Sequence, residues 1–317
     1  MSQCSNPNCF VHDGEKCCMG EMSPSDCLCW NKSASDAMVD APENYINPSR
    51  VPWSSAALGS SDLVRLYQQG PSILIGLLGA ENTGKTTFLA ANYSLLLTGH
   101  FYDVAGFCGS QTLGAWESIA ANTRFTSNNT PSFPPHTPRG LERTPGILHL
   151  ALKDVKNTVK NIFFTDSPGE WFTRWAIDPD AVDAKGAKWT TSHSDAFFIF
   201  ADCEKLSSSE RGAARRELRA IIERLGESVG KRPVTLIWAK SDINPKEQIK
   251  SAIQEALLRN IPHAKEVEVT VNSAKTMLIA VDDLLQKAWS PLNSIHLVEP
   301  ILQNNPFFAY RGHNEHA

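Results

Sequence analysis

The sequence has no long apolar run and no surplus of basic residues. No segment approaches the roughly 18 consecutive apolar residues of a membrane-spanning helix. The N-terminal segment is polar and rich in cysteine, whereas a secretory signal has basic residues followed by an apolar stretch. The formal net charge of −4 gives no overall attraction to nucleic acid or to an anionic membrane. We therefore expect a cytoplasmic protein with no membrane partner.

Cysteine is scarce after residue 30. Six of the eight cysteines lie before that point, and His12 lies among them. In a reducing cytosol, clustered thiols are more often metal ligands than disulfides. The candidate zinc ligands are Cys4, Cys9, His12 and Cys17, with Cys18, Cys27 and Cys29 as competing or additional ligands. Disulfide or redox use and unliganded thiols are the alternatives, and a nucleic-acid-sensing role for this segment stays open.

Composition also suggests how the chain is divided. Apolar residues make up 42% of the 317 residues, which is enough for a sizeable core. We expect residues 1–30 to form the cysteine-rich module, and residues 31–70 to form a polar linker that ends in a short helix. Residues 71–290 are predicted to form the main domain. Residues 291–317 are expected to form an extended tail.

A phosphate-binding pattern, G-x-x-x-x-G-K-[ST], follows the first apolar run of the main domain. Glycines let successive N–H groups curl around a phosphate, and the next helix adds the positive end of its dipole. A lysine then neutralises β and γ oxygens, and a hydroxyl binds Mg²⁺. The residues expected to bind nucleotide here are Gly79, Asn82, Thr83, Gly84, Lys85, Thr86 and Thr87.

A second polar motif, Asp166 to Gly169, ends a strand predicted over residues 159–165. A carboxylate in this place can hold Mg²⁺, and the glycine N–H can meet a γ-phosphate. A strand over 146–152 is expected to form a hairpin with it. The stretch 99–145 is expected to be a long loop with one helix near 115–121.

The rest of the domain alternates between apolar runs and amphipathic stretches. Strands are predicted over 196–201, 234–239 and 267–271, and helices over 207–227, 248–259 and 277–288. This alternation predicts an α/β fold with a doubly wound, mostly parallel sheet. The polar motifs all follow strands, and such sheets bind ligands at the carboxyl ends of their strands.

The ordered motifs resemble the G1, G3, G4 and G5 boxes of the translation-factor and Ras-like class of P-loop GTPases. The resemblance rests on residues 79–86, 166–169, 240–242 and 273–275. It implies that the chain binds GTP and GDP with Mg²⁺. Asp242 would accept hydrogen bonds from guanine, Lys240 would lie along the base, and the backbone around Ala274, between Ser273 and Lys275, would donate to O6. Such a site discriminates against adenine.

The same resemblance implies a switch I threonine that completes the Mg²⁺ shell. Thr144 is the expected residue and Thr137 is the alternative, although Thr144 can equally be only the start of a strand. Lys85, Thr144 and position 170 would then carry catalysis. Position 170 is Glu where Ras-like enzymes have Gln, so slow intrinsic turnover is expected. Arg143 would stabilise transition-state charge in cis, or would simply be solvated.

Three further positions give expectations of their own. Ala239 replaces the usual Asn or Thr of the base box, which removes a tie to the phosphate loop. Asn82 matches the asparagine of potassium-activated relatives and suggests dependence on K⁺. The aromatic group Trp171, Phe172 and Trp175 either faces a partner or packs against the next helix.

A narrower resemblance points to the double-GTPase type found in bacterial conflict and defence systems. It rests on the long 99–145 stretch, the Pro168 to Glu170 sequence and the cysteine module. It implies a protein effector or partner GTPase. The leading hypothesis is a Mg²⁺-dependent GTPase switch. The alternatives are a hydrolytically inert GTP-binding scaffold with a zinc interaction module, and an ATP-using P-loop enzyme.

Overall fold

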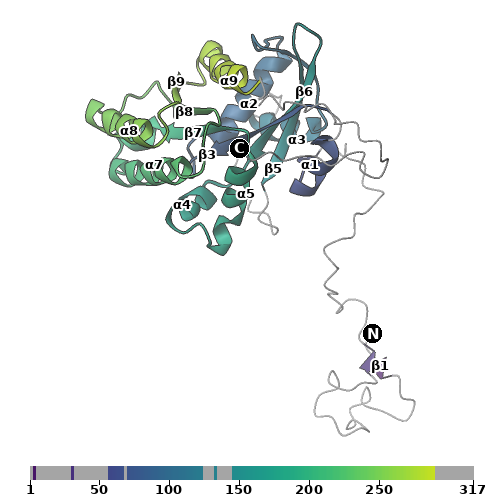
Figure 1. The fold of residues 1–317 in the computed structure, drawn as a ribbon, viewed down its shortest axis with the longest axis horizontal. Helices are drawn as coiled ribbons and strands as arrows, with labels where there is room; N and C mark the ends of the chain where they lie inside the picture. The colour runs from purple at the N-terminus through teal and green to yellow at the C-terminus, as the bar shows by residue number, and fades with distance from the viewer. Residues whose placement is uncertain are drawn as a thin grey trace, which may run out of the picture. The chain divides into compact units, whose positions relative to one another are not determined.

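The computed structural model describes residues 3–4, 30–31, 56–67, 70–123, 132–133 and 145–289. The chain divides into two units, 1–51 and 52–317. In the first unit, β1 (Gln3–Cys4) and β2 (Trp30–Asn31) pair antiparallel. The second unit holds the larger sheet and its helices (Figure 1). None of the helices in the described ranges is long and apolar enough to cross a membrane.

The second unit is built on a seven-stranded sheet in the order β4-β5-β6-β3-β7-β8-β9. The strands are β3 (Ser72–Leu78), β4 (Gly106–Gly109), β5 (Gly146–Lys153), β6 (Val159–Asp166), β7 (Ala196–Asp202), β8 (Val234–Ala239) and β9 (Lys265–Val269). Five of these strands, from β6 to β9 in the sheet order, run parallel, and β5 and β4 extend the β6 edge antiparallel. The α/β prediction with a mostly parallel sheet is confirmed.

The central strands form where the sequence is continuously apolar. Both faces of β7 and β8 are covered by helices, and every residue of these two strands is buried. Such strands show no alternation, because there is no solvent-facing side for polar residues. By contrast, β9 has the sequence KEVEV and is mostly exposed. It forms the sheet edge beside β8, and its charged residues protect that edge from further pairing.

One face of the sheet is covered by α2 (Lys85–Leu97), α3 (Leu113–Ala120) and α9 (Ala274–Trp289). Phe88 of α2 lies edge-on against Phe198 and Phe200 of β7. Trp116 of α3 stacks on Tyr93 of α2. Because Phe88 follows the phosphate-loop pattern by two residues, this packing fixes the start of α2 against the central strands.

The opposite face is covered by α4 (Gly169–Ile177), α5 (Lys185–His193), α6 (Cys203–Ser207), α7 (Arg211–Gly226) and α8 (Glu247–Asn260). The helix α1 (Ser60–Tyr67), expected within the linker, packs Leu63 and Leu66 against β3, β5 and β6. Short 3-10 turns lie at Ala121–Thr123 and Val182–Ala184.

The structure corrects three sequence predictions. The stretch after α2 contains the predicted helix, which is α3, but it also contributes an unpredicted strand, β4, which pairs with β5. The helix predicted over 207–227 is α7, which begins only at Arg211. A separate short helix, α6, precedes it: Asp202 caps α6 with its side chain, and extended backbone at Ser208 ends it. The last strand is Lys265–Val269 rather than 267–271, in register with β8. The helices α4 and α5 were not predicted.

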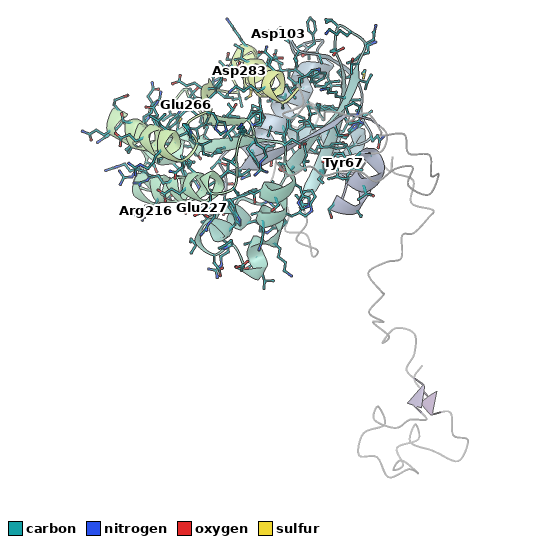
Figure 2. All side chains as sticks on the ribbon, in the orientation of Figure 1. Tyr67, Asp103, Arg216, Glu227, Glu266 and Asp283 are labelled. Atoms are coloured by element: carbon teal, nitrogen blue, oxygen red, sulfur yellow. The ribbon has the colours of Figure 1, made fainter. Side chains whose placement is uncertain are left out.

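The aromatic group after Gly169 is packed inside the molecule. Trp171, Phe172 and Trp175 are 5%, 0% and 4% exposed and belong to the core under α4. The packing interpretation of this group is therefore confirmed. The outer surface of α7 carries charged side chains of both signs; Arg216 on this helix and Glu227, directly after it, are labelled in Figure 2. Two ion pairs, from Arg219 to Glu223 and from Arg224 to Glu227, lie along it.

A buried polar network attaches the β4–α3 region to the sheet. The ring of His149, in β5, accepts a hydrogen bond from the Gln111 backbone at Nδ1 (2.9 Å), and its Nε2 lies 3.0 Å from Asn161 Oδ1. Nε2 is therefore the protonated nitrogen of a neutral ring. The His149 carbonyl accepts from Trp116 Nε1 (2.9 Å). Burial lowers the pKa of His149 below its ordinary 6.5, although the Asn161 hydrogen bond acts in the opposite direction.

This network predicts acid sensitivity. Since the folded state binds its proton less well than the unfolded state, the stability that His149 contributes is present above pH 6.5 and is lost as the pH falls below it. We expect His149→Leu to reduce unfolding free energy at pH 7.5 by about 1–3 kcal/mol, because buried donors lose their partners. The unfolding free energy of this variant should also decrease less than that of the wild type between pH 7.5 and pH 5.5. Urea denaturation at both pH values measures this.

The matched control is His193→Gln, because His193 is exposed on α5. It should leave the buried network intact, and with it the acid sensitivity that we assign to His149. An unchanged acid sensitivity in His149→Leu would show that other groups cause it.

Candidate functional site

The phosphate-loop pattern joins β3 to α2 and leaves the first turn of α2 open. Gly84, the residue before the helix, has φ 91°, a left-handed conformation that glycine adopts without strain. The N-cap residue of α2, Gly84, has no side chain that could accept from the first N–H groups of this helix. The first N–H groups of a helix lack intrahelical partners and carry the positive end of the dipole. This end of α2 is therefore suited to bind an anion.

Lys85 is buried directly behind that loop. Its ammonium group donates to the carbonyl oxygens of Gly79 and Ala80, both at 2.9 Å. Burial lowers the pKa of Lys85 to about 8, although nearby Asp166, Glu170 and Glu81 act in the opposite direction. A phosphate group brought against this ammonium would restore its preference for the charged form.

The hydroxyl of Thr86 and the carboxylate of Asp166 lie together. Thr86 Oγ1 donates to Asp166 Oδ1 at 3.0 Å, and Asp166 ends β6, the strand next to β3. One hydroxyl and one carboxylate beside a phosphate site form the oxygen donor set that Mg²⁺ takes, with its remaining positions filled by water and phosphate. The residues present therefore fit a Mg²⁺ ion.

The start of α4 packs against the phosphate loop. A Cβ atom added to Gly169 would lie 2.3 Å from Ala80 C and from Glu81 N, so only glycine fits there. The N-cap residue of α4, Pro168, makes no side-chain cap hydrogen bond. Ser167 is 1% exposed, and its hydroxyl has no hydrogen-bond partner among the residues that the structure describes. The motif at 166–169 thus lies next to the phosphate loop, as predicted.

The other side of the site comes from the turn after β8. Lys240, with φ 58°, directs Nζ to Asp202 Oδ2 (2.9 Å) and Glu204 Oε2 (2.8 Å). Burial by itself lowers the pKa of Lys240, but the hydrogen bonds to Glu204 and Asp202 raise it above its ordinary value. Asp242 is exposed and accepts from Thr270 Oγ1 at 3.1 Å.

A cavity of about 540 Å³ joins these elements. Its lining includes phosphate-loop residues 81–87, Gly169 and Glu170 after β6, and Lys240 and Asp242 after β8. The volume lies in the range of sites for nucleotide-sized ligands. Among the described residues, Gly79 and Asp166 do not line the cavity. They contact lining residues instead, since Lys85 donates to the Gly79 carbonyl and Thr86 donates to Asp166. Ser273, Ala274 and Lys275 lie at the N-terminal end of α9 and are not among the lining residues in the described part of the chain, although Met277 is.

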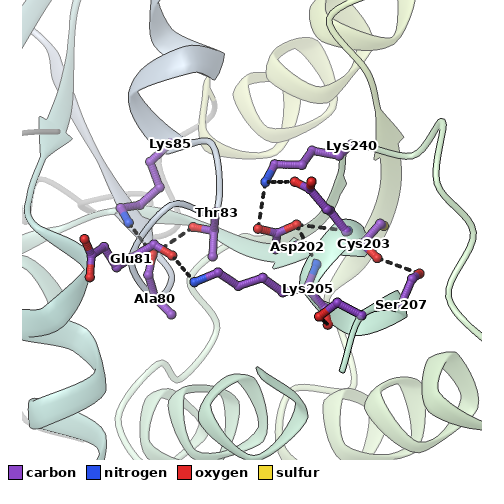
Figure 3. Close-up of polar contacts among 11 residues, drawn as sticks. Ala80, Glu81, Thr83, Lys85, Asp202, Cys203, Lys205, Ser207 and Lys240 are labelled. Carbon is purple, nitrogen blue, oxygen red and sulfur yellow. Dashed lines mark hydrogen bonds and ion pairs between the residues drawn. The ribbon is translucent and has the colours of Figure 1, made fainter. Parts of the chain in front are cut away.

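The structure adds residues that the sequence did not single out. Phe133 lines the cavity and is 71% exposed. Asp202, Glu204 and Lys205 also contact site residues. Lys205 Nζ donates to the carbonyl of Glu81 at 3.0 Å, and Figure 3 shows this contact beside the Lys240 ion pairs. A polar Asp202 at the end of an otherwise apolar strand was the available signal.

Several predicted residues lie outside the described part of the chain. They are Arg143, Thr144 and the alternative Thr137, and the zinc candidates Cys9, His12, Cys17, Cys18, Cys27 and Cys29. Cys4 lies in β1, but its side chain is not described. Among the described residues, no group of three or more His, Cys, Asp or Glu is arranged to hold a metal. The proposed zinc ligands and the switch I threonine therefore stay predictions.

Gly169→Ala tests the close packing of the two motifs. The added methyl group requires the phosphate loop or the start of α4 to move, because backbone atoms fill its space. We expect the affinity for a non-hydrolysable GTP analogue to fall roughly tenfold or more, as expected when a well-packed site is forced apart. The matched control is Gly212→Ala on α7, where the nearest atom is Arg216 Nη1 at 3.7 Å. Calorimetry showing equal affinities in both variants would contradict this geometry.

The lowered pKa of Lys85 predicts proton uptake on nucleotide binding. With a pKa of about 8, Lys85 is partly neutral above pH 8 in the unliganded chain, and bound phosphates would recharge it. Affinity for GDP should therefore fall as the pH rises above 8. At pH 8.5, calorimetry in two buffers of different ionisation enthalpy should show uptake of more than about half a proton.

The control for this prediction is the same titration at pH 7, where Lys85 is already charged in the free chain. Proton uptake by this lysine should vanish there. Equal proton balance at both pH values would contradict a lowered pKa.

Comparison with known proteins agrees with this arrangement. The family model Double-GTPase 2 matches residues 73–290, well over half of the chain. A search of curated proteins found no match. The matched range begins in β3, ends just after α9, and contains the phosphate loop, the 166–169 motif and the turn after β8. The chain therefore belongs to the Double-GTPase 2 family of P-loop GTPases.

Proposed function

We propose that the chain binds GTP with Mg²⁺, hydrolyses it to GDP, and acts as a nucleotide-dependent switch on a protein partner. The observation that carries this proposal is the single cavity shared by the phosphate loop, the start of α4, and Lys240 and Asp242. Each of these three elements follows a strand of the same sheet. Together they provide separate places for phosphates, the reacting γ-phosphate and a base.

The phosphate half has the charge needed for phosphoryl transfer. The α2 N-terminus and the Lys85 ammonium would stabilise negative charge on β and γ oxygens. Thr86 and Asp166 would hold Mg²⁺, which supplies further charge neutralisation at those oxygens. Thr144 is the proposed third Mg²⁺ ligand. Arg143 is the proposed cis cation.

The base half favours guanine. The Asp242 carboxylate is an acceptor only and can receive two hydrogens from guanine N1 and N2, whereas adenine has no such pair. Asp242 lines the cavity and follows β8, whereas the 166–169 motif follows β6. In the sheet, β3 and β7 lie between these two strands. This chemistry supports GTP rather than ATP as the substrate. The backbone around Ala274 is the proposed donor to O6.

A switch requires an element that responds to the γ-phosphate. The start of α4 is the candidate, because Gly169 contacts the phosphate loop and begins a helix whose N-cap residue, Pro168, makes no side-chain cap hydrogen bond. Its movement would be transmitted to a protein effector or a partner GTPase, in keeping with a role in bacterial defence. The cysteine-rich segment, with Zn²⁺, would serve as the docking module. We also propose K⁺ dependence, because Asn82 matches the asparagine that potassium-activated GTPases carry at this position of the loop. Asn82 has φ 63°.

Glu170 favours a second candidate, a GTP-binding scaffold without hydrolysis. This residue lines the cavity where Ras-like enzymes use a glutamine to orient water. An ionised carboxylate cannot donate a hydrogen bond to the phosphate or the attacking water in the way an amide does. The scaffold and the slow GTPase therefore differ in one measurable property, phosphate release.

We predict slow phosphate release by the wild type with GTP and Mg²⁺, and none above background by Lys85→Ala. Glu170→Gln should increase the single-turnover rate by roughly tenfold or more, since the new amide can orient water. Replacing Na⁺ with K⁺ in the same assay tests the cation dependence.

The two candidates give opposite results in this assay. No release from wild-type protein that binds GTP would favour the scaffold and contradict hydrolysis. An unchanged rate in Glu170→Gln would show that position 170 does not meet the attacking water.

A further inference from the structure

The segment Asp202–Lys205, at the turn from β7 into α6, touches both halves of the nucleotide site. Asp202 is the last residue of β7, and its side chain is 2% exposed. Oδ1 accepts the backbone N–H groups of Glu204 (3.0 Å) and Lys205 (3.2 Å). Oδ2 accepts from Lys240 Nζ. One oxygen of the buried carboxylate therefore holds the backbone at the start of α6, and the other orients the Lys240 side chain.

Glu204 adds a second carboxylate to the same ammonium group. Its side chain is 60% exposed, and Oε2 lies 2.8 Å from Lys240 Nζ. Hydrogen bonding to Lys240 lowers the pKa of Glu204. Because Lys240 is held by two carboxylates from one turn, its long side chain is confined to one position beside the base half of the cavity. A single exposed partner would constrain it much less.

Lys205 reaches in the other direction, to the phosphate half. Its ammonium donates to the Glu81 carbonyl across 124 residues of sequence. Figure 3 shows Lys205 extending from this segment to Glu81, and Lys240, which follows β8, reaching toward Asp202. A charged donor on a loop carbonyl restricts the backbone that must present its N–H groups to phosphate.

The end of β8 cannot make this connection itself. Ala239 is its last residue, and a Cβ placed on Gly84 would lie 3.9 Å from the Ala239 methyl. The two backbones are therefore close, but a methyl group forms no hydrogen bond. Any polar tie from the base side to the phosphate loop at this point must come from another element, and Lys205 provides one.

We infer that Asp202, Glu204 and Lys205 are positioning residues for nucleotide binding: the two carboxylates hold Lys240 for the base, and Lys205 holds the phosphate loop at Glu81. This inference rests on the proposed binding of guanine nucleotides. It predicts different losses of affinity for GMP and GDP, which a general loss of stability would not produce. Disturbing the base side should weaken GMP and GDP equally, whereas disturbing the phosphate side should weaken GDP and spare GMP, since only GDP carries a β-phosphate.

The experiment measures Kd values for GMP and GDP with Mg²⁺ by displacement of a fluorescent GDP derivative. Glu204→Gln should weaken both nucleotides by the same factor, roughly two- to fivefold, as for a partly exposed ion pair. Lys205→Met should weaken GDP roughly three- to tenfold, as for the loss of one solvent-exposed hydrogen bond, and leave GMP unchanged. Lys205→Arg keeps a donor and should restore GDP binding.

Matched controls are Glu223→Gln and Lys188→Met, which break exposed ion pairs on α7 and α5. Both should bind like the wild type, and all variants should share its unfolding midpoint. Unchanged Kd values in Glu204→Gln and Lys205→Met, or equal losses of GMP and GDP in Lys205→Met, would overturn the positioning role. A wild type that binds no guanine nucleotide would instead contradict the proposed function itself.

Discussion

The buried ammonium group of Lys85 is the constraint on which the site depends. It lies among backbone carbonyls at the end of β3, where burial lowers its pKa to about 8. An ammonium group removed from water is costly unless an anion compensates for it. The two motifs around it meet this need. In the proposed function the α2 N-terminus would direct a phosphate toward Lys85, and Asp166 lies beside Thr86, where a bound cation would balance the phosphates.

The sheet places these groups, and much of it follows from the sequence. The runs ILIGLL, AFFIFA and VTLIWA are continuously apolar, as is typical of strands that are buried on both faces inside a parallel sheet. Strands β7 and β8 therefore appeared where they were predicted, and β3 formed at the apolar run before the phosphate loop. Because parallel strands carry their motifs at their carboxyl ends, the order of the motifs in the chain was enough to predict one shared site. The cavity lined by Lys85, Gly169 and Asp242 agrees with that reasoning.

Other features depended on contacts that local sequence does not reveal. β4 has four residues and forms because β5 offers it an open edge. The charged strand β9 is stabilised by its register with β8 rather than by an apolar run. The contact from Lys205 to Glu81 joins positions far apart in sequence, so no spacing rule predicts it. Gly169 was identified by its motif, but the reason that only glycine fits is the backbone of Ala80 and Glu81.

The central claim is that this cavity binds guanine nucleotides selectively. Calorimetry with Mg²⁺ should compare GDP with ADP for the wild type and for Asp242→Ala. The account predicts that the wild type prefers GDP by orders of magnitude and that the substitution removes this preference, because the carboxylate no longer matches the guanine hydrogens. Equal binding of ADP and GDP by the wild type would contradict it, and would leave only a phosphate-binding loop without base recognition.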